Sequence, residues 1–338
     1  MKPKNALCGL AMAVVLQWGM LAFSAQAQNL FVESSGNILE FTPGVAQSTF
    51  ASGLNAPQGL ACDSAGNLFE ADIGSGNIYE FTPGGMRSTF ASGLPGPFAL
   101  AFNSAGNLFV TTIPGNIIEI TPGGAQSTFA VGLGLGGAIA LAFDNAGDLF
   151  LADKPGPPFP PGYIYKITPG VVNSIFASGL SPNGLAFDSA GNLFVADSGS
   201  GNIYEFTNGV ATEMGTFASG LSPNGLTFDS AGNLFESDGS GNIYEFTPGG
   251  MRSTFATVLS GPDYLAFQPL HALAIVLSGT NVILTWPTNV TGTLQFTTNL
   301  VSPAAWNTNL PSPVVVNGQN AVTNPISGSQ QFFRLSSP

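Results

Sequence analysis

One position of an internal repeat collects the polar side chains best suited to chemistry in this sequence. It is the residue that begins the first apolar segment of each repeat unit, and the six ring residues, in chain order, are Gln58, Phe98, Ile139, Asn183, Asn224 and Asp263. Amide and carboxylate oxygens are ligands that Ca²⁺ and Mg²⁺ prefer. The four polar ring residues therefore form a candidate metal site, and the alternative is a polar channel mouth that holds only water.

A loop in the third complete unit is a second candidate. Residues 154–162 are rich in proline, begin with Lys154 and carry Phe159 near the tip. Proline stiffens a loop, so Lys154 and Phe159 are candidate binding residues of a lid or recognition loop. Variation in loop length without any function explains the same observation.

Four aspartates recur at the end of the second apolar segment of their units. Such a repeated carboxylate indicates a structural role, in which it accepts hydrogen bonds from loop main chain. The four residues are Asp72, Asp153, Asp197 and Asp238. The sequence contains no P-loop, no HExxH zinc helix and no GxSxG motif, so these nucleotide, zinc and hydrolase signatures give no support to an enzyme.

The repeat that positions these residues has a period of about 40 residues, the length of a four-stranded propeller blade. Complete units begin near Gly59, Phe98, Ile139, Asn183 and Gly225. In the fourth, the pattern predicts strands at residues 184–188, 193–197, 202–207 and 216–219. The first two strands are nearly all apolar, which predicts that they are buried on both faces.

The two ends of the repeat region complement each other. Residues 29–32, 37–42 and 48–52 predict the second, third and fourth strands of a blade, and residues 264–267 predict a first strand with no continuation. Pairing the two fragments adds one blade to the five complete units and leaves no open sheet edge. We therefore predict an all-β fold, a six-bladed β-propeller over residues 28–269.

Composition limits the partners and the location of the protein. Lys and Arg total 7 against 19 Asp and Glu, a net charge of −12, which repels phosphate backbones and argues against nucleic acid. Residues 1–27 combine early lysines, an apolar stretch and Ala-Gln-Ala, which predicts a secretory signal peptide rather than a retained membrane anchor. The mature protein would be extracellular, at the cell surface or periplasmic, with no membrane span, and its single Cys62 forms no internal disulfide.

The C-terminal part has a different composition. No acidic residue follows Asp263, and Thr, Asn, Ser and Val become frequent. Short apolar segments separated by Pro and Asn-Gly predict a small β-sandwich of fibronectin or immunoglobulin type over residues 270–338. It resembles the C-terminal modules of secreted bacterial surface proteins, which implies attachment, and a spacer domain is the alternative.

The segments Asn-Gly-Leu-Ala-Phe-Asp from Asn183 and Asn-Leu-Phe-Val-Ala-Asp from Asn192 resemble NHL-repeat propellers and the regucalcin/gluconolactonase (senescence marker protein) family. The resemblance covers about residues 28–268 and implies a six-bladed propeller. In that family Glu, Asn and Asp bind a divalent metal and the Asp acts as base. The resemblance therefore implies Gln58, Asn183, and Asn224 or Asp263 as ligands, and Asp263 as the candidate base, with an uncharged Gln58 as the main departure.

Two functions follow from these observations. The leading one is a secreted, non-enzymatic propeller that binds a protein, glycan or small molecule through the loops between the second and third strands of its blades, with a C-terminal attachment module. The alternative is a Ca²⁺-dependent lactone or ester hydrolase of gluconolactonase type. Residues 74–91 and 239–256 are identical, and such copied blades favour a need for shape over a need for a single catalytic constellation.

Overall fold

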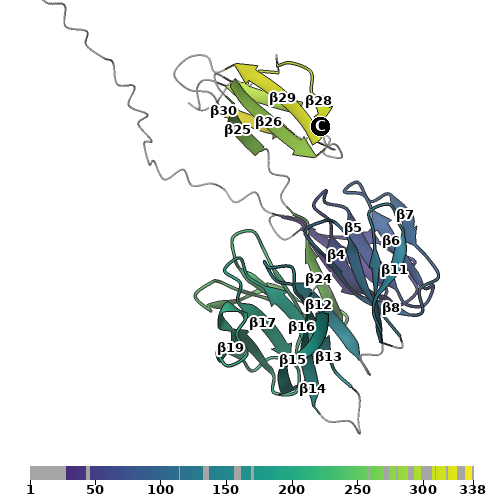
Figure 1. Cartoon of the computed structure of the whole chain (residues 1–338). Helices are drawn as coiled ribbons and strands as arrows, with labels where there is room; N and C mark the ends of the chain where they lie inside the picture. Colours follow the sequence, from purple (N-terminus) through teal and green to yellow (C-terminus); the bar gives the residue numbers. More distant parts are fainter. Residues whose placement is uncertain are drawn as a thin grey trace, which may run out of the picture.

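Each repeat unit folds into a four-stranded antiparallel sheet, and six such sheets form a ring, as predicted (Figure 1). The computed structural model describes residues 28–42, 46–113, 115–131, 137–155, 161–168, 171–257, 259–269, 274–278, 281–287, 293–297, 307–308, 310–316, 319–325 and 332–336. The predicted signal peptide and Phe159 lie outside the described residues.

The six sheets share one strand order, from the channel outward. The sheet that joins the two ends of the ring consists of β24 (Pro262–Phe267), β1 (Leu30–Ser34), β2 (Asn37–Thr42) and β3 (Ala46–Ala51). The next two are β4 (Pro57–Cys62), β5 (Leu68–Asp72), β6 (Asn77–Phe81) and β7 (Arg87–Ala91), then β8 (Pro97–Phe102), β9 (Leu108–Thr112), β10 (Asn116–Ile120) and β11 (Gln126–Ala130).

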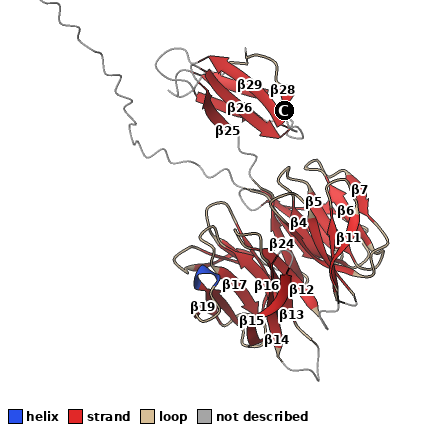
Figure 2. Cartoon of the chain, viewed as in Figure 1, coloured by secondary structure: helices blue, strands red, loops and turns tan. Residues whose placement is uncertain are grey.

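The remaining three sheets complete the ring. They are β12 (Ala138–Phe143), β13 (Leu149–Asp153), β14 (Gly162–Thr168) and β15 (Val171–Leu180), then β16 (Pro182–Phe187), β17 (Leu193–Asp197), β18 (Asn202–Phe206) and β19 (Met214–Ser219), then β20 (Pro223–Phe228), β21 (Leu234–Asp238), β22 (Asn242–Phe246) and β23 (Arg252–Ala256). Among the described residues one short 3₁₀ helix, η1 (Thr207–Gly209), interrupts this all-strand chain (Figure 2).

Burial is greatest in the second strand of each blade. All five residues of β5, β9, β13, β17 and β21, and of β1, are buried. The first strands are less completely buried, as in β16, where Asn183 and Phe187 are only partly buried, because one end of each lines the open channel. Burial on both faces is therefore correct for the second strands and only partly correct for the first.

Phenylalanine rings fill the interfaces between blades. Phe150 is 0% exposed and packs edge-to-face on Phe176 and Phe187, with ring centroids 5.1 and 5.0 Å apart. The same arrangement recurs at Phe69, Phe109, Phe194 and Phe235. Edge-to-face packing contributes stability beyond the buried area. Cys62 occupies the place of such a phenylalanine, and burial raises the pKa of its thiol, which agrees with an inert side chain.

The ring closes where the two chain fragments meet. β24 pairs antiparallel with β1, so that Leu30, Phe31 and Val32 lie opposite Phe267, Ala266 and Leu265. This strand pair confirms the predicted closure of the propeller, because β24 supplies the first strand of the sheet that contains β1, β2 and β3.

The C-terminal strands form two separate sheets. β25 (Ala274–Ser278), β26 (Asn281–Pro287), β29 (Gln319–Pro325) and β28 (Val314–Val316) make one antiparallel sheet, and β27 (Thr293–Thr297) pairs with β30 (Phe332–Ser336). A β-sandwich consists of two packed sheets, so the two sheets agree with the predicted fold, and their packing into a sandwich stays a prediction. None of the helices in the described residues has the length and apolar character of a membrane span.

Candidate functional site

A β-bulge in the first strand of each blade turns the ring residues toward the channel. Each ring residue is the second residue of its strand, and the pairing register shifts beside it, as between Pro182 and Gly184 in β16 and between Pro223 and Leu226 in β20. A bulge redirects a side chain that regular pairing would place on a sheet face. The repeat thus aims six side chains at one point.

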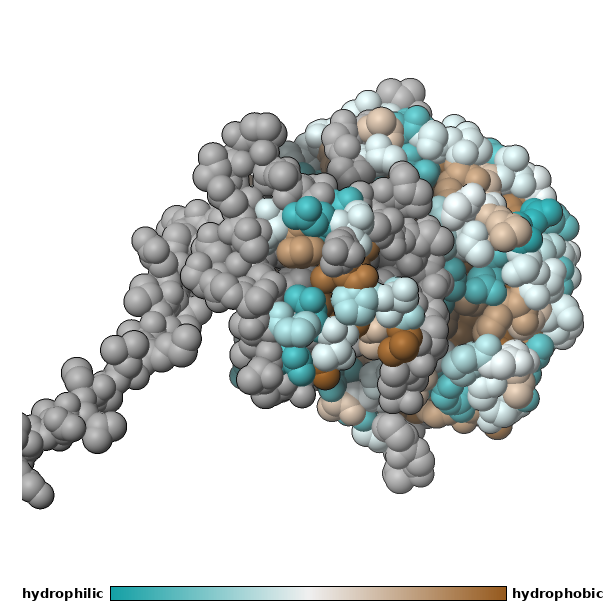
Figure 3. Space-filling model, turned by 90° about the horizontal axis from the view of Figure 1, so that it is seen from above, coloured by the Kyte–Doolittle hydropathy of each residue, from teal (hydrophilic) through white to brown (hydrophobic). Residues whose placement is uncertain are grey.

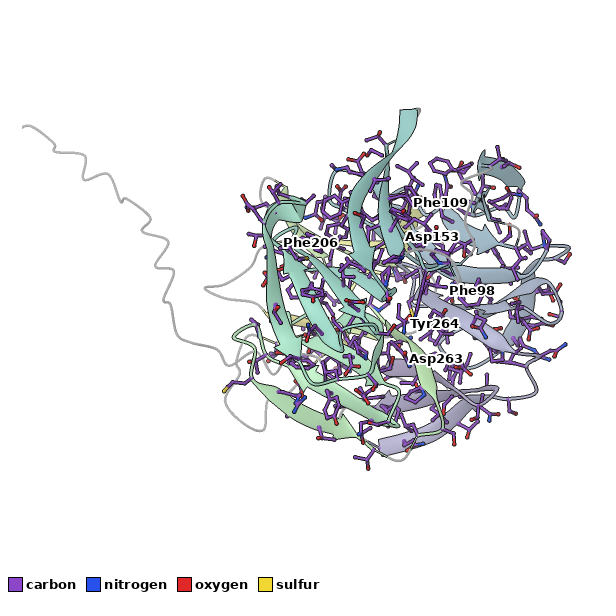
Figure 4. The ribbon with its side chains drawn as sticks, turned by 90° about the horizontal axis from the view of Figure 1, so that it is seen from below. Phe98, Phe109, Asp153, Phe206, Asp263 and Tyr264 are labelled. Atoms are coloured by element: carbon purple, nitrogen blue, oxygen red, sulfur yellow. The ribbon has the colours of Figure 1, made fainter. Side chains whose placement is uncertain are left out.

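All six ring residues line one cavity of about 260 Å³ at the channel mouth, together with Lys154, Gly225 and Tyr264. Figure 4 shows Phe98, Asp263 and Tyr264 beside the channel, whereas Phe206 lies away from it between blades. The structure therefore brings together the candidate residues Gln58, Asn183, Asn224, Asp263 and Lys154. The second loop candidate, Phe159, lies outside the described residues.

The polar ring residues form a directed chain of hydrogen bonds. The Lys154 ammonium donates to Oδ1 of Asn183 over 2.7 Å, Nδ2 of Asn183 donates to Oδ1 of Asn224 over 3.0 Å, and Nδ2 of Asn224 donates to Oδ1 of Asp263 over 3.0 Å. Its direction is set by its ends, because an ammonium only donates and a carboxylate only accepts. Both amides are thereby held in one orientation.

The hydrogen bonds between these side chains decide whether the ring residues fit a divalent cation. The amide oxygens of Asn183 and Asn224 already accept hydrogen bonds, one of them from the positive charge of Lys154. Only Asp263 among the ring residues carries a negative charge, and the described residues contain no group of three His, Cys, Asp or Glu side chains placed to hold a metal. In this arrangement Gln58, Asn183, Asn224 and Asp263 do not fit Ca²⁺ or Mg²⁺, because the cation would meet the ammonium.

Two carboxyl groups at the mouth hold protons more tightly than usual. Desolvation of its carboxyl group by the surrounding protein raises the pKa of Asp263. Burial, with a smaller contribution from the negative charge of Asp263, raises the pKa of Glu33 to about 7. Glu33 and Asp263 line a neighbouring cavity of about 540 Å³, which shares Gln58 and Asp263 with the first. The sequence analysis missed Glu33, although a glutamate after three apolar residues of a second strand was a usable signal.

Tyr264 forms the floor of the cavity. The position after each ring residue is Gly59, Ala99, Ala140, Gly184 or Gly225 in five blades and Tyr264 in the sixth. The small residues allow close approach, since a Cβ on Gly184 would collide with the main-chain oxygen of Asn224. The Tyr264 hydroxyl reaches across the channel and donates to the main-chain oxygen of Ile139 over 3.4 Å. One large side chain among five small ones was the overlooked signal.

The four repeated aspartates have the structural role predicted for them. Asp72 accepts hydrogen bonds from the main-chain N–H groups of Asn55 and Ser75 at 2.6 and 2.9 Å. Asp153, Asp197 and Asp238 accept in the same way from Gly137, Ser181 and Ser222. These carboxylates therefore hold the crossing between blades as well as the loop that follows the second strand.

Comparison with known proteins agrees on the fold. No family model matches the chain, and no curated protein matches it. A chain of the nidogen/laminin complex is 20% identical with a TM-score of 0.63, covering 72% of this chain and 98% of its own. A gluconolactonase from Xanthomonas campestris is 17% identical with a TM-score of 0.58, covering 76% and 91%. A calcium-binding regucalcin from Agrobacterium tumefaciens is 16% identical with a TM-score of 0.55, covering 69% and 82%. The chain shares the six-bladed propeller fold of these gluconolactonase- and regucalcin-like structures.

Proposed function

We propose that this protein is a binding propeller that takes up a small molecule in the channel-mouth cavity. The observation that supports it is the hydrogen-bond chain from Lys154 to Asp263, which presents polar groups in one orientation to a cavity with an apolar side. A concave site with a few fixed polar groups is typical of small-molecule recognition. The proposal includes export through residues 1–27 and attachment through residues 270–338.

The outer surface favours a small molecule over a large docking partner. Large exposed hydrophobic side chains of the described residues are spread over several blades, as Met86, Ile175 and Met251 illustrate. In the view of Figure 3, hydrophilic and hydrophobic residues are mixed over the described propeller surface. A surface that docks a protein partner usually gathers its apolar side chains into one patch, so the cavity is the better candidate site.

A cavity-filling substitution tests the proposal. We expect Ile139→Trp, which places a larger side chain in the cavity, to abolish binding of small molecules identified on the mature protein by ligand-observed NMR. The matched control is Ile175→Trp, because Ile175 is 59% exposed and lies outside the cavity. A screen in which every bound compound keeps its affinity for Ile139→Trp would contradict the proposal.

The second candidate function is a metal-dependent lactone or ester hydrolase. It is favoured by the likeness to gluconolactonase structures and by the raised pKa of Asp263, which suits a base beside the cavity. Under the binding proposal we expect calorimetry to show no Ca²⁺ binding tighter than about 1 mM to the metal-stripped protein. Tight Ca²⁺ binding that disappears in Asp263→Ala would instead support the hydrolase and justify assays on a lactone panel.

A further inference from the structure

The Lys154 ammonium is held by neutral oxygens. It donates to Oδ1 of Asn183 and to Oγ of Ser198, both at 2.7 Å. Ser198 must accept this bond, because its own hydroxyl donates to the main-chain oxygen of Ser181 over 3.1 Å. An ammonium has three donors, and neither of the ion pairs found among the described residues involves Lys154. One donor thus remains for a ligand in the cavity that Lys154 lines.

The charge of Lys154 is incompletely compensated. Burial lowers the pKa of its ammonium, and the nearby Asp197 carboxylate only partly opposes this effect. The Asp197 oxygens are already used by the main-chain N–H groups of Ser181 and Gly199 and by the Ser200 hydroxyl. A bound anion would supply a hydrogen bond to a negatively charged oxygen, which the protein itself does not provide for Lys154.

One side of the cavity is apolar and adjoins Lys154, because Ile139 and Lys154 belong to the same blade. Phe98 and Ile139 are the two apolar ring residues, and the ring of Tyr264 meets that of Phe98 edge-on, with centroids 5.9 Å apart. The hydrogen bond from Tyr264 to the main chain of Ile139 fixes this ring across the floor. A ligand that reaches Lys154 therefore places the rest of its structure against an apolar wall.

Size and charge narrow the ligand class. The cavity volume of about 260 Å³ lies near the lower limit of small-molecule sites. The carboxyl groups of Asp263, which lines the cavity, and of Glu33, which lies beside it, disfavour a second negative charge on the ligand. We propose that the cavity binds a small monocarboxylate with an apolar body, whose carboxylate accepts from Lys154 and whose body packs on Phe98, Ile139 and Tyr264. This inference rests on the proposed function.

Calorimetry of the mature protein with three probes tests the inference. 3-Phenylpropionate has both the charge and the apolar body, 3-phenylpropionamide lacks the charge, and acetate lacks the body. We expect 3-phenylpropionate to bind at least about tenfold more tightly than either of the others, as a charge-assisted bond and buried apolar area both predict. Lys154→Met should remove the preference for carboxylate over amide. Lys166→Met is the control, because Lys166 pairs with Asp144 and Asp148 outside the cavity.

The possible failures are distinguishable. Equal binding of the carboxylate and the amide, or an unchanged preference in Lys154→Met, overturns the carboxylate inference. No binding of any probe up to about 10 mM overturns it as well. The proposed function fails separately, if no compound of any class responds to Ile139→Trp.

Discussion

The unfolding free energy of the protein should fall as the pH rises from about 5 to about 8. The cause is a pair of glutamates, Glu70 and Glu236, at equivalent positions of two second strands. Both are 0% exposed, and none of their carboxyl oxygens has a hydrogen-bond partner in the described structure. A buried carboxylate without partners is costly, so the folded protein keeps these groups protonated.

Burial, with a smaller contribution from neighbouring carboxylates, raises the pKa of each group from 4.5 to about 8. Asp72 and Glu33 raise the pKa of Glu70 further, and Asp238 raises that of Glu236. The guanidinium groups of Arg87 and Arg252, which stack over Tyr79 and Tyr244, lower the two pKa values, and the main chain of Gln58 makes a smaller contribution of the same sign at Glu70. These effects reduce the rise in the two pKa values without cancelling it.

The direction in which stability changes with pH follows from the number of protons that each state binds. Between the unfolded and folded pKa values the folded state binds more protons than the unfolded state, so stability is complete below about pH 4.5 and is lost as the pH rises through about 8. Each carboxyl group should contribute a loss of roughly 3–4 kcal/mol over this range. Urea unfolding at several pH values measures it.

The double variant Glu70→Gln/Glu236→Gln removes both ionisations with little change in shape. It should lose most of the pH dependence and be more stable than the native protein at about pH 8, with Glu33 leaving a smaller residual slope. Glu213→Gln is the control, because Glu213 is exposed. A double variant with the same pH dependence as the native protein would show that these two carboxyl groups do not carry the effect.

Deletion of residues 262–267 from the full chain should abolish cooperative unfolding of the propeller. β24 supplies the inner strand of the joining sheet, and Leu265 and Ala266 belong to two different interfaces between blades. Its loss leaves β1 unpaired at one edge and opens the ring on both sides of this sheet. Differential scanning calorimetry and circular dichroism follow the loss of the transition.

A milder variant keeps the test informative if the deleted protein does not fold. Leu265 is 7% exposed, so Leu265→Ala should lower the unfolding free energy by about 2–5 kcal/mol. Val314→Ala is the control, because Val314 is 61% exposed and lies in the C-terminal strands. An unchanged melting temperature in both the deletion and Leu265→Ala would mean that β24 does not close the ring.

Most of the fold could be predicted because the same strand and turn pattern recurs in every repeat unit. The predicted second strand at residues 193–197 matches β17 (Leu193–Asp197), since a run of four apolar residues followed by aspartate is a local pattern. The predicted first strand at residues 184–188 begins two residues later than β16 (Pro182–Phe187). The bulge at Asn183 explains this error, because a register shift leaves no mark in the alternation of residue types.

Alignment of the repeats also predicted which six residues meet at the channel mouth, but not what they do there. The polar ring residues suggested ligands for a cation, whereas Lys154 lies in the loop of one blade and bonds to Asn183 in the next. A loop residue carries no repeat signal for such a contact, since only one blade has a lysine there. The same holds for Ser198, which the sequence analysis did not single out.

The sequence by itself determined the six-bladed ring, its closure by the two chain ends and the placement of the ring residues, because these depend on strand and turn patterns that each unit repeats. The tertiary structure decided how Lys154 orients Asn183 and Asn224, how Tyr264 crosses the channel and how Glu70 and Glu236 lose solvent. These features depend on side chains that meet across blades. Their distances are set by the packing of whole sheets and not by any local pattern.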